Sequence, residues 1–159
     1  MNARNNGGDE LKLSVAFGQT GQVFLDTAPL IFWVEANPVY EQIVDSVFEM
    51  IESGQLRAVT SPISLAESLI HPIRKGNQLV VNAFTNVITS GANTVFVTID
   101  EKIARKAAEL RVKYNFKLPD SLQLAVAIES GCESFLTNDH QLKQVSEINV
   151  IVIDDLEIG

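Results

Sequence analysis

The chain has 159 residues, which is enough for one ordinary domain and too few for two. Apolar residues make up 46% of it and charged residues 20%, proportions that predict a globular protein with a real hydrophobic core. The net charge of −8 weighs against a nucleic-acid partner, although six of the twelve basic residues fall within residues 102–117. Because a bound divalent cation neutralises clustered carboxylates, the acidic excess is compatible with a metal site.

The cysteine content and the length of the apolar stretches indicate the cellular compartment of the protein. The single cysteine, Cys132, cannot form an internal disulfide and fits a reducing compartment, and we expect it to be a small buried hydrophobe. Apolar stretches such as residues 148–153 are far shorter than the roughly 20 residues that span a bilayer, and the N-terminus resembles no signal peptide. We expect a cytoplasmic protein without a membrane partner, with a flexible tail over residues 1–20 and one domain over 21–159.

The first half of the domain alternates short apolar runs with helical patterns. In chain order the predicted elements are a strand at 23–25, a helical turn at Pro29, a helix over 38–53, a strand over 56–60, a helix from 61 to about 70, and a helix over 78–89. Ser61 and Pro62 supply an N-cap and a first-turn proline, and Gly54 suits a helix C-cap. A weaker alternation over residues 11–17 allows an extra strand.

The second half repeats the alternation. Its predicted elements are a strand at 95–97, a helix over 100–114, a helix from 119 to 130, a strand at 135–137, a short helix, and a strand at 150–153. Pro119 opens the last long helix, and Gly131 ends it. Strands that alternate with helices predict a single α/β domain with a mostly parallel central sheet of about five strands and helices on both faces.

Four carboxylates follow or face the ends of these strands. Asp26 comes directly after the first strand and Asp139 shortly after the fourth, while Glu67 and Asp120 lie on helices that begin near the same edge. Ligands of open parallel sheets bind beyond the carboxyl ends of the strands, and right-handed crossovers bring these points to one rim. The sequence therefore predicts a site made of these four acids.

Three of the acids also have a local structural role available. Asp26 and Asp139 suit an N-cap or an Asx-turn after a strand. Asp120 suits the first turn of a helix, where it complements the dipole, and Asp120 with Gln123 matches a capping box. For each of them alone, the structural role and the functional role both stay open.

Glu67 gives the stronger signal. Ser64 with Glu67 also matches a capping box, but a helix that starts at Ser61 places Glu67 in its middle. The residues expected on the same face are Ile63, Ala66 and Ile70. A carboxylate on an apolar stripe is costly unless it is paired or binds a cation, so we interpret Glu67 as functional.

Together the four acids indicate a divalent cation. Carboxylates that meet at one rim repel each other unless a cation lies among them. Ligation by oxygen alone suits Mg²⁺ or Mn²⁺ and not Zn²⁺, which prefers His or Cys. The two histidines, His71 and His140, lack ligand-like spacing, and we expect them at the surface or in a supporting position.

The acids and their surroundings resemble a PIN domain from residue 23 to about residue 153. The segments that carry the resemblance are Val23-Phe-Leu-Asp26-Thr27, Ser64-Leu-Ala-Glu67-Ser-Leu, Leu118-Pro-Asp120-Ser-Leu-Gln-Leu-Ala125-Val-Ala-Ile and Phe135-Leu-Thr-Asn-Asp139. Their order, the helix before the third segment and the closing apolar strand make the combination specific. One departure is Ser121, where the family commonly has alanine after the third acid.

The resemblance implies an endoribonuclease specific for single-stranded RNA, with one or two Mg²⁺ or Mn²⁺ ions. It further implies a likeness to VapC-type toxins, which a small antitoxin holds inactive, and a homodimer. Carried over to this chain, Asp26, Glu67, Asp120 and Asp139 form the metal cluster, and the Thr137 hydroxyl supports it. The RNA backbone would be steered by basic residues such as Lys102, Arg105 and Lys106. The alternative for that basic stretch is the solvated face of a helix.

Two other functions stay open. One is a PIN scaffold that has lost catalysis and only binds a partner, against which the presence of all four acids weighs. The other is a different acid-cluster α/β phosphotransfer enzyme with an aspartyl nucleophile. A dehalogenase-type site needs a second Asp two residues after Asp26, where this chain has Ala28, and the adjacent acids and strand-end lysine of a receiver are missing.

Overall fold

A computed structural model describes residues 11–18 and 21–158. Its centre is a five-stranded sheet in the order β4-β3-β2-β5-β6, and every neighbouring pair is parallel. The strands are β2 (Gly21–Leu25), β3 (Leu56–Thr60), β4 (Thr94–Phe96), β5 (Ser134–Thr137) and β6 (Asn149–Val152). The predicted parallel sheet of five strands is confirmed; β2 starts two residues before its predicted start, and the bounds of the other four strands lie within one residue of the prediction.

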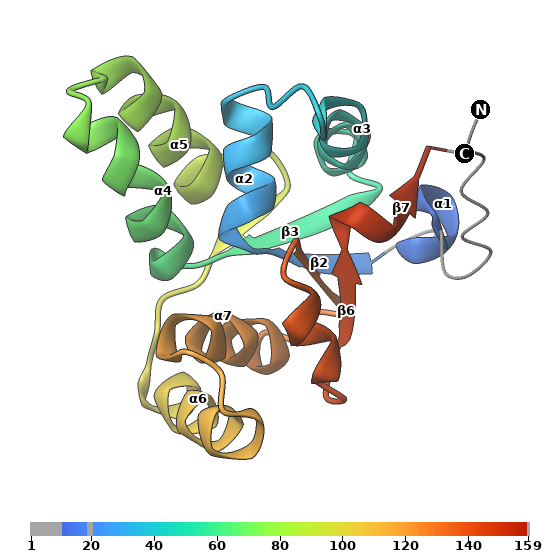
Figure 1. Ribbon diagram of the computed structural model, residues 1–159, viewed down its shortest axis with the longest axis vertical. Helices are drawn as coiled ribbons and strands as arrows, with labels where there is room; N and C mark the ends of the chain where they lie inside the picture. Colours follow the sequence, from blue (N-terminus) through green and yellow to red (C-terminus); the bar gives the residue numbers. More distant parts are fainter. Residues whose placement is uncertain (1–10, 19–20, 159) are drawn as a thin grey trace, which may run out of the picture.

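Helices cover both faces of the sheet, as predicted (Figure 1). Those on one face are α2 (Thr27–Val34), α3 (Glu41–Glu52), α4 (Pro62–Arg74) and α5 (Gln78–Ser90), and those on the other are α6 (Glu101–Tyr114) and α7 (Leu118–Glu129). Two short 3₁₀ helices, η1 (His140–Gln144) and η2 (Ile153–Asp155), flank β6. The fold is a three-layer α/β domain.

The two faces have separate hydrophobic cores because side chains alternate along each strand. On β2, Val23 and Leu25 pack against α2, α3 and α5, whereas Phe24 packs on the α6–α7 face. Phe24 stacks on Phe135 of β5, with ring centroids 5.1 Å apart. Apolar residues on both sides explain why the strands are continuous apolar runs in the sequence.

Local signals end and begin the helices around the sheet. Gly54 follows α3 with φ of 82°, a left-handed conformation that a glycine adopts without steric cost. The Ser61 hydroxyl caps α4 by accepting the backbone N–H of Ile63 over 3.1 Å, and Pro62 is the first residue of the helix. The helix then runs to Arg74, past the predicted end near residue 70.

The structure differs from the expected flexible tail over residues 11–18. β1 (Leu11–Lys12) pairs in parallel with β7 (Leu156–Glu157), and α1 (Leu13–Ala16) is a single helical turn in place of the extra strand. Leu13 and Phe17 are both buried, because a spacing of four residues puts them on one side of a helical turn. The expectation for residues 1–10 and 19–20 lies outside the described residues.

Within residues 11–18 and 21–158, no helix is long and apolar enough to cross a membrane. Cys132 is buried among the apolar residues of the α6–α7 face, as its sequence context predicts.

Candidate active site

Asp26 lies at the centre of the carboxyl edge of the sheet, where β2 ends and α2 begins. One carboxylate oxygen, Oδ1, accepts the backbone N–H of Thr27 over 2.8 Å, so Asp26 caps α2. The other, Oδ2, accepts the hydroxyl of Thr137 over 2.8 Å. The backbone N–H of Asp26 donates to the carbonyl of Leu136 over 3.0 Å, which extends the β2–β5 ladder. Asp26 is only 9% exposed and is therefore held in a defined position.

Thr137 connects Asp26 to a second acid. It is the last residue of β5, and its buried hydroxyl donates to Asp26 and accepts the backbone N–H of Asp139 over 3.1 Å. Asp139 is exposed, and its Oδ1 accepts the backbone N–H of Gln141 over 2.9 Å, so it caps η1. One hydroxyl thus orders the positions of two carboxylates from neighbouring strands.

Glu67 approaches the same edge from α4. Its Oε1 accepts the hydroxyl of Thr27 over 2.9 Å, which links α4 to the residue after Asp26. The expectation that Glu67 shares a buried apolar stripe is wrong, because Glu67, Ala66 and Ile70 are exposed. The buried residues of α4 are Ser64, Ser68 and Pro72. Because small polar residues make up much of the buried face of α4, apolar periodicity in the sequence does not identify that face.

Asp120 completes the set from α7. It is half-buried in the first turn of that helix, where a negative charge complements the dipole. Neither of the two capping boxes that the sequence allows forms, since α4 starts with Ser61 as N-cap, as predicted, and α7 starts two residues before Asp120. The local roles of Asp26, Asp120 and Asp139 are therefore real, and they coexist with the gathering of the acids.

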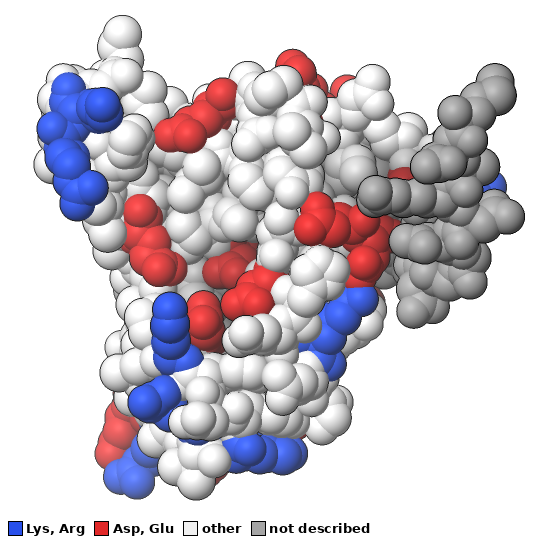
Figure 2. Space-filling view, viewed as in Figure 1, with Lys and Arg blue, Asp and Glu red and all other residues white. Residues whose placement is uncertain are grey.

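Electrostatics show that the four acids influence one another. The pKa of Asp26 is raised to about 6, chiefly by burial, and the charges of Asp120 and Glu67 add to the rise. The hydrogen bonds from Thr137 and Thr27 lower this pKa and so oppose the effect. Burial also raises the pKa of Asp120, and the charges of Asp139 and Glu67 add to the rise, while Lys117 opposes it. Figure 2 shows acidic side chains gathered in the middle of this face, between the α4 and α7 regions.

The donor set fits a hard divalent cation that keeps part of its water. Carboxylate oxygens from four segments supply only oxygen ligands, and two of the acids resist ionisation without a counter-charge. Among the residues that the structure describes, no three Asp, Glu, His or Cys side chains form a ready-made ligand group. Mg²⁺ is commonly bound through one or two carboxylates with several waters, so a bound ion here would complete its shell with water.

The basic residues predicted to steer RNA lie on α6 and are paired with acids. Lys102 Nζ is 3.0 Å from Glu129, Arg105 is 3.0 Å from Glu101, and Lys106 Nζ is 3.7 Å from Glu109. The side chains of Lys102 and Arg105 are 76% and 75% exposed, so both cations are solvated and their ion pairs contribute little to stability. The pairing agrees with the alternative of a solvated helix face.

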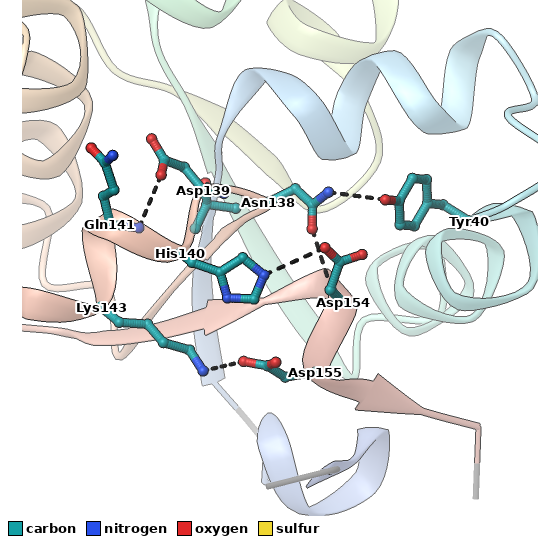
Figure 3. Close-up of polar contacts among 9 residues, drawn as sticks. Tyr40, Asn138, Asp139, His140, Gln141, Lys143, Asp154 and Asp155 are labelled. Carbon is teal, nitrogen blue, oxygen red and sulfur yellow. Dashed lines mark hydrogen bonds and ion pairs between the residues drawn. The ribbon is translucent and has the colours of Figure 1, made fainter. Parts of the chain in front are cut away.

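Sequence reasoning missed a polar clasp around the turn that carries Asp139 (Figure 3). The side chain of Asn138 donates to the Tyr40 hydroxyl over 3.2 Å and accepts the backbone N–H of Asp154 over 3.3 Å. Both histidines are exposed, as expected, and His140 Nε2 lies 3.4 Å from Asp154 Oδ2. Tyr40 and Asp154 are 98 and 16 residues from Asn138 in the sequence, so no local pattern predicts the clasp.

A second missed feature is Gln123, which is fully buried on α7, three residues after Asp120. Its side chain bonds to Ser61 and Ser64 of the α4 start. The only local hint is an amide on the inner, apolar face of α7.

Comparison with known proteins identifies the family. The sequence matches the family model of the PIN domain over residues 23–148, which include all four acids. The chain belongs to the PIN domain family. Comparison with curated protein sequences finds no match.

Solved structures with this fold include toxin–antitoxin proteins. VapBC2 from Rickettsia felis bound to a DNA fragment from its promoter is 16% identical with a TM-score of 0.65, over 82% of this chain and 98% of that one. DNA-bound VapBC from Salmonella typhimurium is 18% identical with a TM-score of 0.65, over 83% and 98%. VapC20 from Mycobacterium tuberculosis, a Sarcin-Ricin loop cleaving toxin, is 15% identical with a TM-score of 0.63, over 80% and 98%. At these identities the likeness shows a shared fold.

Proposed function

We propose that this protein is a metal-dependent endoribonuclease that cleaves single-stranded RNA. The observation that carries the proposal is the gathering of Asp26, Glu67, Asp120 and Asp139 at the carboxyl edge of the sheet, with Asp26 buried and its pKa raised to about 6. PIN domains are a nuclease family, which supports hydrolysis of a phosphodiester bond. The presence of all four acids at one edge weighs against a scaffold kept only for partner binding.

The four acids would have different roles in binding Mg²⁺ or Mn²⁺. Asp26 and Asp120 would bind the ion directly, and Glu67 and Asp139 would hold a second ion or ordered water. When bound, such an ion supplies Lewis acidity and charge neutralisation at the scissile phosphate. Thr137 fixes the orientation of Asp26 by donating to Oδ2, which leaves the carboxylate positioned before any ligand arrives.

The exposure of the rim suits a polymeric substrate. Asp26 is buried and Asp120 is half-buried, whereas Glu67 and Asp139 are exposed, so an extended strand can lie across the acids. Lys102, Arg105 and Lys106 would steer the backbone from α6, since solvated ion pairs exchange partners at small cost. Such contacts are salt-dependent and carry no sequence preference.

We further propose a cytoplasmic toxin with an antitoxin partner. Neighbours in fold include a toxin–antitoxin complex from Klebsiella pneumoniae and VapBC-5 from Mycobacterium tuberculosis, a member of the VapBC family of toxin–antitoxin systems. A homodimer would use exposed apolar residues around the turn between α4 and α5, namely Ile70, Ile73 and Leu79. Replacing Ile73 with Arg should convert the dimer to a monomer in light scattering, with the circular dichroism spectrum of the folded protein kept. A monomeric wild-type protein would rule out this dimer.

The decisive experiment incubates the protein with a mixed pool of single-stranded RNAs in Mn²⁺, Mg²⁺ or EDTA, beside an Asp26→Asn variant. Cleavage that needs metal and disappears in the variant supports the proposal. Absence of cleavage by folded protein that also binds no Mn²⁺ in calorimetry favours the scaffold that only binds a partner. Metal-dependent cleavage that persists in the variant contradicts the assignment of the site.

A further inference from the structure

Three buried polar side chains form a bridge beneath the acids, where α4 and α7 approach the end of β2. Ser61 Oγ donates to Gln123 Oε1, and Gln123 Nε2 donates to Ser64 Oγ over 2.7 Å. Ser64 Oγ donates in turn to the carbonyl of Leu25 over 3.3 Å. Ser61, Ser64 and Gln123, here called the Gln123 bridge, are all 0% exposed.

The bridge connects two layers that the hydrophobic cores leave separate. α4 packs through Leu65 and Leu69 on the face that holds α2, α3 and α5, whereas α7 packs through residues such as Leu124 and Val126 on the opposite face. Figure 1 shows these two helices on opposite sides of the sheet. Apolar burial is non-directional, so it holds each helix on its own face without defining the separation of the two. Hydrogen bonds have a set length and direction and can define it.

Each end of the bridge lies one helical turn from an acid of the candidate site. Glu67 comes three residues after Ser64 on α4, and Asp120 comes three residues before Gln123 on α7. Residues at this spacing are neighbours on a helix surface. The third anchor, the carbonyl of Leu25, belongs to the residue before Asp26. A shift of the bridge therefore moves Glu67 and Asp120 relative to Asp26.

We propose that Gln123 is a positioning residue, which through Ser61 and Ser64 sets the separation between Glu67 and Asp120 and thereby the affinity for a divalent cation. The part of this inference that concerns the cation rests on the proposed function, whereas the separation of α4 and α7 does not. If any one of the three side chains is removed, a buried polar group of the bridge loses its hydrogen-bond partner, which is costly. The three side chains therefore act as a unit.

Two variants break the bridge from opposite sides. Gln123→Met keeps the length of the side chain and removes both polar atoms of the amide, Oε1 and Nε2, and Ser64→Ala removes the hydroxyl that accepts the Gln123 amide hydrogen. Ser68→Ala is the matched control, because Ser68 is also buried on α4 and its hydroxyl has no hydrogen-bond partner among the described residues. If one variant fails to fold, the other carries the test.

Mn²⁺ titration by calorimetry measures the effect on the cation. Groups that orient metal ligands typically contribute about 10–100-fold to affinity, so we expect at least about tenfold weaker Mn²⁺ binding in Gln123→Met and in Ser64→Ala. The double variant should bind no more weakly than either single one, and Ser68→Ala should match wild type. Wild-type affinity in both bridge variants would overturn the proposal.

A distance measurement without metal separates this proposal from the proposed function. Spin labels on His71→Cys in α4 and Val112→Cys in α6, which packs on α7, report the separation of the two layers. The native Cys132 thiol is buried and its pKa is raised to about 12 by that burial, so it should react with the label much more slowly than the introduced cysteines. Gln123→Met should shift or broaden the distance distribution, and Ser68→Ala should leave it unchanged. An unaltered distribution in Gln123→Met overturns the proposal, whether or not the wild-type protein binds Mn²⁺.

Discussion

Replacing Asp26 with Asn should stabilise the metal-free protein while abolishing the proposed cleavage of RNA. The pKa of the Asp26 carboxyl is about 6 in the folded protein, against an ordinary value of 3.8. A difference of about two pKa units corresponds to roughly 3 kcal/mol of unfolding free energy. The folded state therefore holds a proton on Asp26 that the unfolded state has released between about pH 4 and pH 6.

Because of this proton, the free energy of unfolding depends on pH. As pH rises from about 4 to about 6, the free energy of unfolding falls, and above pH 6 the full penalty of about 3 kcal/mol is present. Asn escapes the penalty, and its side-chain oxygen still accepts the Thr27 N–H. Its contact with Thr137 is weaker because the Thr137 hydroxyl must then accept, at a cost of about 1 kcal/mol. The net gain of about 2 kcal/mol corresponds to a rise in melting temperature of roughly 4–8 °C for a domain of this size.

The assay is thermal unfolding by circular dichroism in EDTA at pH 4.5 and pH 7.5. Asp26→Asn should melt above wild type at pH 7.5, and the difference should vanish or reverse at pH 4.5. Asp45→Asn, at an exposed acid on α3, is the matched control and should show no such gap. A variant that is no more stable at pH 7.5, or a gap that is the same at both pH values, would refute the reasoning.

Three further predictions concern the site and the amino-terminal segment. The affinity for Mn²⁺ should rise between pH 5.5 and pH 7.5, because Mn²⁺ must displace the proton that Asp26 binds with a pKa of about 6. Calorimetry at the two pH values tests this, and a constant affinity would contradict it. Thr137→Val removes a hydroxyl that bonds both Asp26 and Asp139, so urea unfolding should show a loss of about 1–3 kcal/mol together with slower cleavage. Phe17→Ala should reduce the free energy of unfolding by about 3–5 kcal/mol because Phe17 is buried, whereas unchanged stability would mean that residues 11–18 do not pack on the domain.

The sheet and the two acids at its strand ends could be predicted because their signals are local. Apolar runs such as residues 23–25 have the length of a strand buried on both faces, and Asp26 directly follows one of them. Ser61 with Pro62, and Gly54, mark helix ends through the conformations that their own backbones favour. Where a single residue and its neighbours decide the conformation, the order of residues is sufficient.

Helix faces and bridges could not be predicted in this way. The sequence pattern predicts Glu67 on an apolar stripe, but α4 turns its serines inward, because Gln123 and the carbonyl of Leu25 satisfy the Ser64 hydroxyl there. Similarly, residues 11–17 alternate like a strand, yet Leu13 and Phe17 enter the core from one helical turn. In both cases the deciding partner comes from a distant part of the chain.

The sequence by itself determined the class of fold, the strands of the sheet and the identity of four acids whose chemistry suits a divalent cation. Only the tertiary structure decided how these acids relate: Asp26 buried and bonded to Thr137, Asp120 half-buried, and Glu67 and Asp139 exposed. It also decided which polar groups hold the helices that carry them. The physical reason is that burial, mutual repulsion and hydrogen bonding across the sheet depend on distances between segments that lie up to 111 residues apart.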